Sequence, residues 1–286
     1  MAWTKVATPR IATILCFAAM PLIPSLALGA DPVGRFSLSA RFGVSGYRME
    51  AINDAISASN HRLSQLQPEW KVPDRIHSGF DFVADAAYDI SNAFRIGIVY
   101  GTTSASANVD YLQAIEVNPQ AGMIMPRVFY RVPWRPMIDM SLRVFAGWLH
   151  FTDARTKIKH EDTSEGSERL EAMTVKGSGN GFVAGLTGEY TLSDTFTLSV
   201  EAGYRAAKAG YDSGSWRIDK LANPGAPSDR CEDLTYDKCL LEESYLWGFL
   251  NEKPPLARGQ VPTVREDLDG DFSGVVLQIG LRVYIF

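Results

Sequence analysis

The 286-residue chain has only three cysteines and four histidines, and its 28 basic residues are fewer than its 33 acidic ones. The net charge of −5 argues against nucleic acid as a partner, because proteins that bind it present an excess of Lys and Arg. Beyond residue 30 there is no uninterrupted apolar run of about 18 residues, which excludes a membrane-spanning helix there. The mean hydropathy of −0.07 suits a soluble protein, but a membrane β-barrel gives similar values because half of its strand residues are polar.

Residues 1–30 have the layout of a secretory signal peptide. Lys5 and Arg10 are followed by an apolar stretch over 11–20 and then by small residues, and no acidic residue occurs. An N-terminal membrane anchor is the alternative, but Pro21 leaves the apolar run too short for a comfortable membrane helix. We therefore expect these residues to be removed on export.

The last fourteen residues, 273–286, alternate between apolar and polar side chains. A period of two is typical of a β-strand with one apolar and one polar face. A strand that is apolar outside and polar inside is what closes a transmembrane β-barrel, where every backbone polar group must be paired. The apolar face consists of Val275, Leu277, Ile279, Leu281, Val283 and Ile285, and the polar face of Gln278, Gly280, Arg282 and Tyr284.

The same alternation recurs in seven more segments. Short connections alternate with long ones between them, as periplasmic turns alternate with extracellular loops in membrane barrels, and aromatic residues gather near both ends of the segments. The eight segments are 36–44, 77–92, 94–101, 124–132, 138–148, 182–192, 196–205 and 275–285, and the long loops are about 48–76, 104–120, 152–178 and 207–272.

We predict from this pattern an all-β fold, an eight-stranded antiparallel up-and-down transmembrane β-barrel with long extracellular loops, formed by residues 31–286. The main rival is a soluble eight-stranded barrel of the lipocalin type. Such a barrel would share the alternation but would point its apolar residues inward.

These features, together with the terminal VYIF, resemble the small outer-membrane barrels of the OmpA-transmembrane and OmpW-like type. The resemblance implies the outer membrane of a Gram-negative-type bacterium as the location. It also implies outer-membrane lipid, lipopolysaccharide and the barrel assembly machinery as partners, with Tyr284 and Phe286 in the assembly signal. No motif predicts a cofactor or a metal ion.

Charged residues occupy the inward positions of the predicted strands. Eight strands enclose a lumen that side chains can fill, and charges buried there must pair because an unpaired buried charge is very costly. We interpret them as a salt-bridge plug, with a gated ion or proton path as the functional alternative. The set comprises Arg41, Asp81, Asp85, Asp89, Arg95, Arg127, Arg131, Asp139, Arg143, Glu189, Glu201, Arg205 and Arg282.

Two of the long loops carry features of their own. In 48–76, Met49, Ile52 and Ile56 are spaced for one face of a helix, which would lie over the barrel mouth, on the membrane surface or on its own loop. In 207–272, a disulfide is predicted between Cys231 and Cys239, since exported proteins meet an oxidising compartment. An apolar patch follows, which would act as a lid, a partner surface or the loop's own core; it contains Leu240, Leu241, Tyr245, Trp247 and Phe249.

The sequence thus favours a non-catalytic outer-membrane barrel with a role in envelope structure and surface contact through its loops. The first alternative is passage of small hydrophobic molecules, as the OmpW-like resemblance implies. The second is a lipid-modifying enzyme, for which His150 and Thr152 at the outer end of a strand are the candidate residues. No acidic partner for His150 can be assigned from sequence.

Overall fold

The structure is a computed structural model that describes residues 34–66, 75–109, 113–134, 139–162, 168–221, 230–231, 249 and 267–285. All of them belong to one compact unit, Pro32–Phe286. The expected signal peptide lies outside the described residues. The elements are β1 Phe36–Gly46, α1 Glu50–Leu66, β2 Ser78–Asp89, β3 Phe94–Ala105, β4 Ala107–Val109, β5 Gln113–Arg131, β6 Met140–Asp162, β7 Glu168–Thr191, β8 Phe196–Leu221, β9 Arg230–Cys231, β10 Asp269–Asp271 and β11 Gly274–Ile285.

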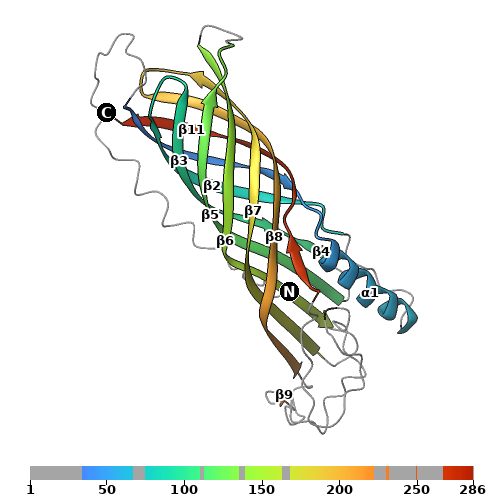
Figure 1. The fold of residues 1–286 in the computed structure, drawn as a ribbon. Coiled ribbons are helices and arrows are strands. Elements are labelled where there is room, and N and C mark those ends of the chain that lie inside the picture. The colour runs from blue at the N-terminus through green and yellow to red at the C-terminus, as the bar shows by residue number, and fades with distance from the viewer. Residues whose placement is uncertain are drawn as a thin grey trace. The chain divides into compact units, whose positions relative to one another are not determined.

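Eight of these strands form a closed antiparallel barrel in the order β1-β2-β3-β5-β6-β7-β8-β11 (Figure 1). The last strand closes it, because β11 pairs with β1 on one side and with β8 on the other. The short strands β4, β9 and β10 pair with β5, β8 and β8 respectively. The predicted eight-stranded up-and-down barrel is therefore confirmed.

Two of the short turns use the same local chemistry. In the β2–β3 turn the hydroxyl oxygen of Ser91 accepts a hydrogen bond from the backbone N–H of Phe94 at 3.0 Å. In the β7–β8 turn Ser193 accepts one from Phe196 at 3.2 Å. A serine hydroxyl that satisfies a backbone donor within a turn favours the reversal of the chain, and each Phe then begins the next strand.

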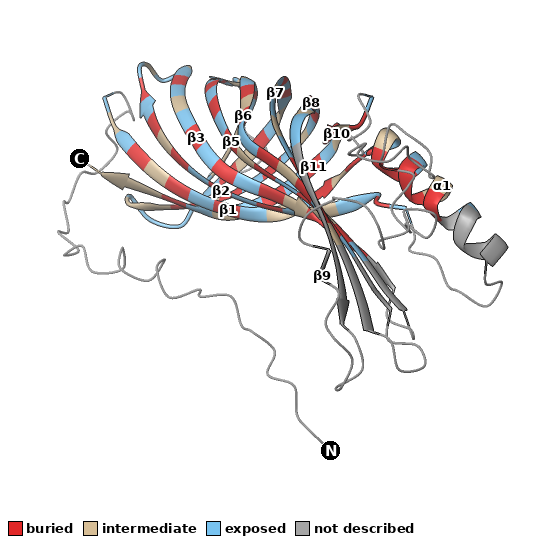
Figure 2. Cartoon of the chain, turned by 90° about the horizontal axis from the view of Figure 1, so that it is seen from below, coloured by how far each residue is buried: buried red, intermediate tan, exposed pale blue. Residues whose placement is uncertain are grey.

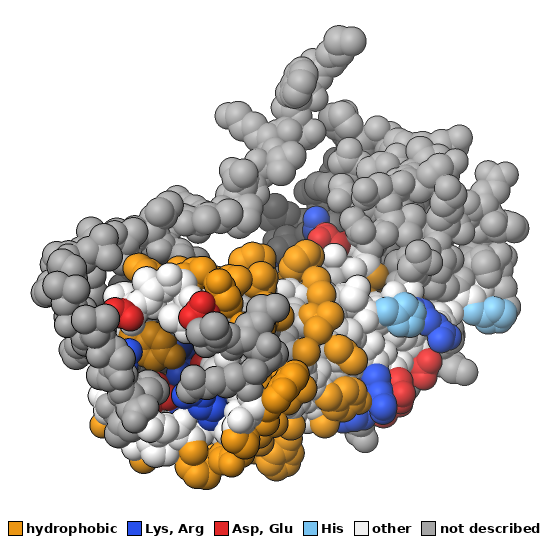
Figure 3. All heavy atoms as spheres, turned by 90° about the horizontal axis from the view of Figure 1, so that it is seen from above, with side chains coloured by type: hydrophobic (Ala, Val, Ile, Leu, Met, Phe, Trp, Pro, Cys, Tyr) orange, Lys and Arg blue, Asp and Glu red, His pale blue; other side chains and the backbone are white. Residues whose placement is uncertain are grey.

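Exposed and buried residues alternate along the barrel strands (Figure 2). The outward residues are apolar and large, with Phe80 69% and Phe182 66% exposed, whereas Arg41 and Arg282 point inward and are fully buried. This arrangement is the reverse of a soluble barrel, and it excludes the lipocalin-like alternative. An apolar exterior around a polar interior is the surface that a bilayer requires of a β-barrel, and Figure 3 shows a band of apolar side chains on one face. Among the residues that the structure describes, no helix has the length and hydrophobicity to cross a membrane.

Strands β5 to β8 are much longer than the other four. They contain 19, 23, 24 and 26 residues, against 11 or 12 in β1, β2, β3 and β11. A tilted strand crosses a bilayer in about 9–11 residues, so these four strands continue beyond it. Parts of the loops expected at 104–120, 152–178 and 207–272 are therefore strand.

The reason for this difference is a reversal in the direction of the apolar side chains. Outside the membrane segment Val117, Ile158, Met173 and Val175 are buried, while Lys157 on the same stretch of β6 is exposed. Beyond the membrane the surroundings are water, so apolar side chains turn inward and polar ones outward. The apolar outer face of each strand ends where this reversal begins, and the strands predicted from that face end there too.

Irregular pairing occurs close to the reversal. The register of β5 with β6 shifts at Gly122/Met123, that of β6 with β7 between Phe151 and Ala154, and that of β7 with β8 at Lys176/Gly177. In β6 the extra residues leave Thr152 and Asp153 both exposed. A β-bulge of this kind bends a strand and re-aims the side chains that follow it.

Helix α1 packs against the long-loop end of the barrel (Figure 1). Met49, Ile52 and Ile56 are at most 2% exposed and join the buried cluster that includes Phe272. The side chain of Asn53 fixes the helix to the chain that returns to β2, since its Oδ1 accepts from the N–H of Ile76 at 2.7 Å and its Nδ2 donates to the carbonyl of Ile76 at 3.1 Å. The apolar face of the helix therefore lies over the barrel end and not on the membrane surface.

Candidate functional site

The lumen of the barrel contains a network of charged side chains. Each of the eight barrel strands contributes a charged residue that is 5% exposed or less. These residues come from strands far apart in the sequence, and the inward direction of alternate side chains brings them together. In strand order the set includes Arg41, Asp85, Arg95, Arg127, Arg143, Glu189, Glu201 and Arg282.

Glu189 on β7 organises the part of the network near the short turns. Arg95 on β3 donates to its Oε1 at 2.5 Å from across the lumen, and Arg143 on β6 donates to Oε2 at 3.1 Å. Arg95 also binds Asp89 through Nε at 2.9 Å and donates to the hydroxyl of Tyr284 at 2.6 Å. Two carboxylates and two guanidinium groups are thus connected by charge-assisted hydrogen bonds.

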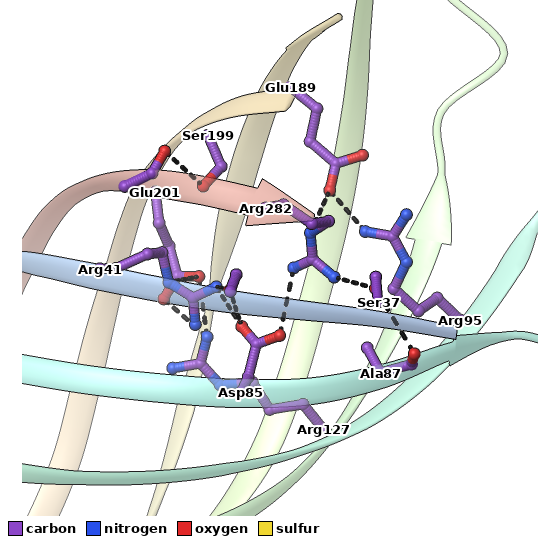
Figure 4. Close-up of polar contacts among 12 residues, drawn as sticks. Ser37, Arg41, Asp85, Ala87, Arg95, Arg127, Glu189, Ser199, Glu201 and Arg282 are labelled. Atoms are coloured by element: carbon purple, nitrogen blue, oxygen red, sulfur yellow. Dashed lines mark hydrogen bonds and ion pairs between the residues drawn. The ribbon is translucent and has the colours of Figure 1, made fainter. Parts of the chain in front are cut away.

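A second group lies in the middle of the lumen (Figure 4). Arg41 on β1 donates to Asp85 on β2, which also accepts from Ser39 at 2.6 Å. Arg127 on β5 lies within 2.8 Å of both oxygens of Glu201 on β8. The Nε of Arg41 lies 3.7 Å from Glu201, so these pairs are linked across the lumen.

Arg282 on β11 connects the two groups. Its guanidinium lies 3.5 Å from Asp85 and 3.5 Å from Glu189, and its Nη1 donates to Ser37 at 2.9 Å. Figure 4 shows this side chain between Asp85 and Glu189. The closing strand of the barrel is therefore tied to β1, β2 and β7 through one side chain.

A glycine makes room for this crowding. A Cβ on Gly280 of β11 would lie 2.0 Å from the carbonyl oxygen of Ala40 and 2.6 Å from Cγ of Arg41. Real Cβ atoms do not approach so closely, so any side chain at this position would displace the backbone or Arg41. The absence of a side chain at Gly280 thus leaves room for the side chain of Arg41 against the inner face of β11.

A third group joins the barrel to its loops at the outer end. Asp81 on β2 accepts from Ser45 at 2.6 Å, from Thr103 at 2.5 Å and from Arg205 at 3.3 Å. Arg205 also donates to the carbonyl of Phe272 at 2.9 Å. Because Phe272 precedes β11 and packs on neighbouring aromatic rings, this group anchors the returning chain in the mouth of the barrel.

Tyr47 lies just beyond β1 in this outer group. Its hydroxyl is 2.5 Å from Oγ1 of Thr103, and Arg205 lies over its ring at 5.5 Å from the centroid. Burial, reinforced by the negative charge of Asp81, raises the pKa of Tyr47 to about 12. Tyr47 and Thr103 were missed by sequence reasoning because they carry no charge, and only their contact with Asp81 identifies them.

Two of the predicted lumen residues are placed differently from the others. Asp139 is exposed at the turn before β6, and Arg131 is half-buried at the end of β5. The prediction assigned Asp139 to the interior because it continues the alternation of β6, but β6 begins only at Met140. Of the expected assembly signal, Tyr284 lies against Arg95, and Phe286 is outside the described residues.

Apolar side chains fill the interior between and beyond the charged groups. Phe129 and Phe145 pack with ring centroids 5.9 Å apart, and Arg127 lies over the ring of Phe145 at 4.6 Å. Nearer the outer end, Phe272 contacts Phe151 with ring centroids at 5.0 Å. Close-packed side chains thus occupy the lumen from the charged groups to the mouth.

The loop features of the sequence lie mostly outside the described residues. Cys231 belongs to β9, but Cys239 is not described, so the disulfide stays a prediction. Of the apolar patch only Phe249 is described, whereas Leu240, Leu241, Tyr245 and Trp247 are not. Phe249 is 1% exposed and belongs to the same buried cluster as Met49 and Phe272.

His150 stands at the outer end of the membrane segment of β6. Its Nδ1 lies 2.8 Å from Oδ1 of Asn180 on β7, and its ring stacks on Trp148 with centroids 6.3 Å apart. An amide cannot stabilise a protonated imidazole as a carboxylate does, and Thr152 is exposed at the bulge of β6. Within the described ranges no group of three or more His, Cys, Asp or Glu side chains is placed to hold a metal ion.

No protein-family model and no curated protein matches the chain. Among solved structures it is similar to the attachment invasion locus protein Ail of Yersinia pestis, with 10% identity, a TM-score of 0.36 and coverage of 88% of this chain and 99% of that one. It is also similar to a major outer membrane protein of Thermus thermophilus, with 12% identity, a TM-score of 0.42 and coverage of 88% of this chain and 100% of that one. The outer membrane protease OmpT of Escherichia coli has 9% identity and a TM-score of 0.33, with coverage of 91% of this chain and 99% of that one.

These likenesses carry no argument about activity. The architecture is established by the molecule itself, which has a closed ring of eight antiparallel strands, an exposed apolar surface and a charged interior. An apolar exterior around a charged interior suits a bilayer, and closed barrels of this kind are typical of outer membranes. The chain is therefore a small eight-stranded outer-membrane β-barrel.

Proposed function

We propose that this outer-membrane barrel is a non-catalytic and non-conducting protein that contributes to envelope structure and makes surface contacts through its long outer strands and loops. The observation that carries the proposal is the charge network, in which every barrel strand supplies a buried charge that lies near an opposite one. Such a network resists opening, because separating its pairs would leave buried charges without partners.

The filled interior supports the same role. A conducting pore needs a continuous column of water, which eight-stranded barrels are generally too narrow to hold. Here Arg95 reaches across the lumen to Glu189, and Phe129, Phe145 and Phe151 occupy the space beyond. Passage of small hydrophobic molecules, the main alternative, would need an apolar path from the mouth to the lipid, and these side chains would block such a path.

The proposal that the protein is not an enzyme rests on His150. Hydrolysis by covalent catalysis uses a side-chain nucleophile activated by a base, with a third group that orients the base. The group beside His150 is the neutral amide of Asn180, at 2.8 Å. OmpT of Escherichia coli, one of the similar solved structures, is an outer membrane protease, so the proposal that this chain is no enzyme rests on the site and not on the fold.

Conductance in planar bilayers tests the proposal. The purified chain is inserted at low protein density, and insertion is verified by a change in gel mobility between unheated and boiled samples. We expect no steady current above the baseline of the bare bilayer. Large and stable ion-selective steps would contradict the proposal and give first place to transport.

A further inference from the structure

A groove of about 890 Å³ crosses the lipid-facing surface of the barrel. One side follows a row of cross-strand neighbours from Tyr88 on β2 through Ile96 and Val128 to Ala146 and Ala184 on β7. Tyr88 lies next to a short turn, whereas Ala146 and Ala184 lie several residues in from the short-turn ends of β6 and β7. Because barrel strands are tilted, a row of direct neighbours climbs obliquely through the membrane.

Small or irregular residues form the floor of the groove, and large ones form its walls. Ala146 faces Ala184 across the β6–β7 ladder, and one step outward Trp148 faces Phe182. Between β5 and β6 the paired register is interrupted at Pro126, which has no N–H to donate. The groove therefore has the apolar lining that suits a hydrocarbon chain.

The strands that carry the outer end of the groove bear a cluster of basic side chains beyond the membrane. Arg155 and Lys157 on β6 and Lys176 on β7 point outward, and Arg155 lies directly opposite Lys176 in the ladder. Like charges directly opposite each other destabilise a sheet. Arg155 is paired with Asp153, but in the described part of the chain no ion pair involves Lys157 or Lys176.

This cluster stands on a chain whose net charge is −5, so it is not the consequence of a generally basic surface. A neighbouring lysine gives a useful contrast. Lys208 on β8 is 58% exposed at its side chain, but it lies 3.1 Å from Asp269 and 3.7 Å from Asp271. These acids raise the pKa of Lys208 and balance its charge. Lys157 and Lys176 thus form the part of this sheet that attracts an anion.

We propose that this face binds a phosphorylated glycolipid of the outer leaflet, with an acyl chain in the groove and the anionic sugar headgroup on Arg155, Lys157 and Lys176. The proposal rests on the proposed envelope role and adds a lipid class and a site to it. Phosphate groups would relieve the repulsion between opposed cations, and apolar surface would be covered at the same time.

The spacing of the two parts selects a glycolipid over a simple phospholipid. Arg155 follows Trp148 by seven residues along β6. At about 3.3 Å per residue, with the bulge allowed for, this is roughly 20 Å along the strand, or about 15 Å along the membrane normal at a tilt of about 40°. The polar layer of a phospholipid bilayer is only about 5–8 Å thick on each side, so the headgroup must contain several sugars.

Native mass spectrometry of the detergent-solubilised full chain tests the site. The probes, added at equal concentration, are a lipopolysaccharide with a short phosphorylated core, the same lipid after dephosphorylation, and phosphatidylglycerol. Of these three probes, we expect only the phosphorylated lipopolysaccharide to remain bound. Lys157→Gln and Lys176→Gln should each weaken its binding about fivefold, the effect of one basic residue near an anionic lipid surface, and Ala146→Phe should weaken it by filling the groove.

Two matched variants serve as controls. Lys208→Gln removes an equally exposed but already balanced charge, and Val144→Phe adds a ring to the same strand outside the groove. Both should change binding less than twofold, and all variants should keep the gel mobility of the folded barrel. Equal retention of phosphatidylglycerol, equal loss with Lys208→Gln, or no retention of any probe would overturn the proposal. A conducting barrel that still bound the glycolipid would instead contradict the proposed function alone.

Discussion

At the scale of single residues, the lumen shows how a membrane barrel keeps charge inside without instability. Glu189 lies near three guanidinium groups, those of Arg95, Arg143 and Arg282. Burying a charge costs several kcal/mol, and only several close partners offset that cost. Loss of the carboxylate that three bases share should therefore destabilise the barrel more than loss of any one of those bases.

Replacing Glu189 by Gln should accordingly destabilise the barrel. The substitution keeps the shape of the side chain but leaves three guanidinium groups with less negative charge, which is expected to cost about 3–5 kcal/mol. Urea-induced unfolding of the barrel in lipid vesicles, followed by tryptophan fluorescence, measures this loss.

Asp139→Asn provides the control, since Asp139 is exposed at the end of the same lumen. It should change the free energy of unfolding by less than about 0.5 kcal/mol. Equal effects of the two substitutions would show that the buried network does not hold the barrel together.

At the scale of elements, helix α1 is held by its apolar face and by Asn53. Ile52 is 0% exposed in the cluster that also contains Phe272 at the start of the closing strand. The helix is therefore a part of the outer end of the barrel and not an independent segment. Its stability comes from tertiary packing, as for most amphipathic helices of this length.

Ile52→Asp should release α1 and leave the barrel intact. A carboxylate cannot be buried in an apolar cluster without a partner, so the helix would leave its site. Limited proteolysis should then cut within residues 50–66 at least tenfold faster than in the unmodified chain, while the gel mobility of the folded barrel is retained. Asp54→Ala, on the exposed face of the same helix, should leave the cleavage rate unchanged; an equal acceleration there would refute the packing role of Ile52.

At the scale of the whole molecule, two surroundings act on one closed sheet. The segment in the membrane is apolar outside and charged inside, and the extension of β5 to β8 is apolar inside and polar outside. The bulges in β6 and β8 lie close to the change. One continuous strand can thus satisfy both lipid and water, because its side chains change their roles at the membrane surface.

Such a closed barrel should resist detergent when cold. Every one of the eight barrel strands has two partners, so unfolding requires the whole ring of hydrogen bonds to open. The purified chain should therefore migrate at a different position in an unheated gel sample than in a boiled one, with a circular dichroism spectrum of β-structure. A mainly helical spectrum, or identical migration of both samples, would contradict the fold.

The sequence by itself determined the barrel and most of its interior. Period-two alternation in eight segments predicts the strands, and the inward positions identify Arg41, Glu189 and Arg282 because charge inside a narrow lumen has to be paired. The alternation is a local property, so it can be read without the fold. The alternation places Asp139 wrongly, because the pattern in the sequence extends in front of β6, which begins at Met140.

Only the tertiary structure decided the partners and the outer half of the molecule. Which base meets which acid depends on the register of strands far apart in the sequence, such as those that carry Arg95 and Glu189, 94 residues apart. The extension of β5 to β8 escaped prediction because its apolar residues point inward, and that direction has meaning only once the position of the membrane is known. The groove and the cluster of Arg155, Lys157 and Lys176 likewise exist only across strands, since neither is contained in any one segment of the sequence.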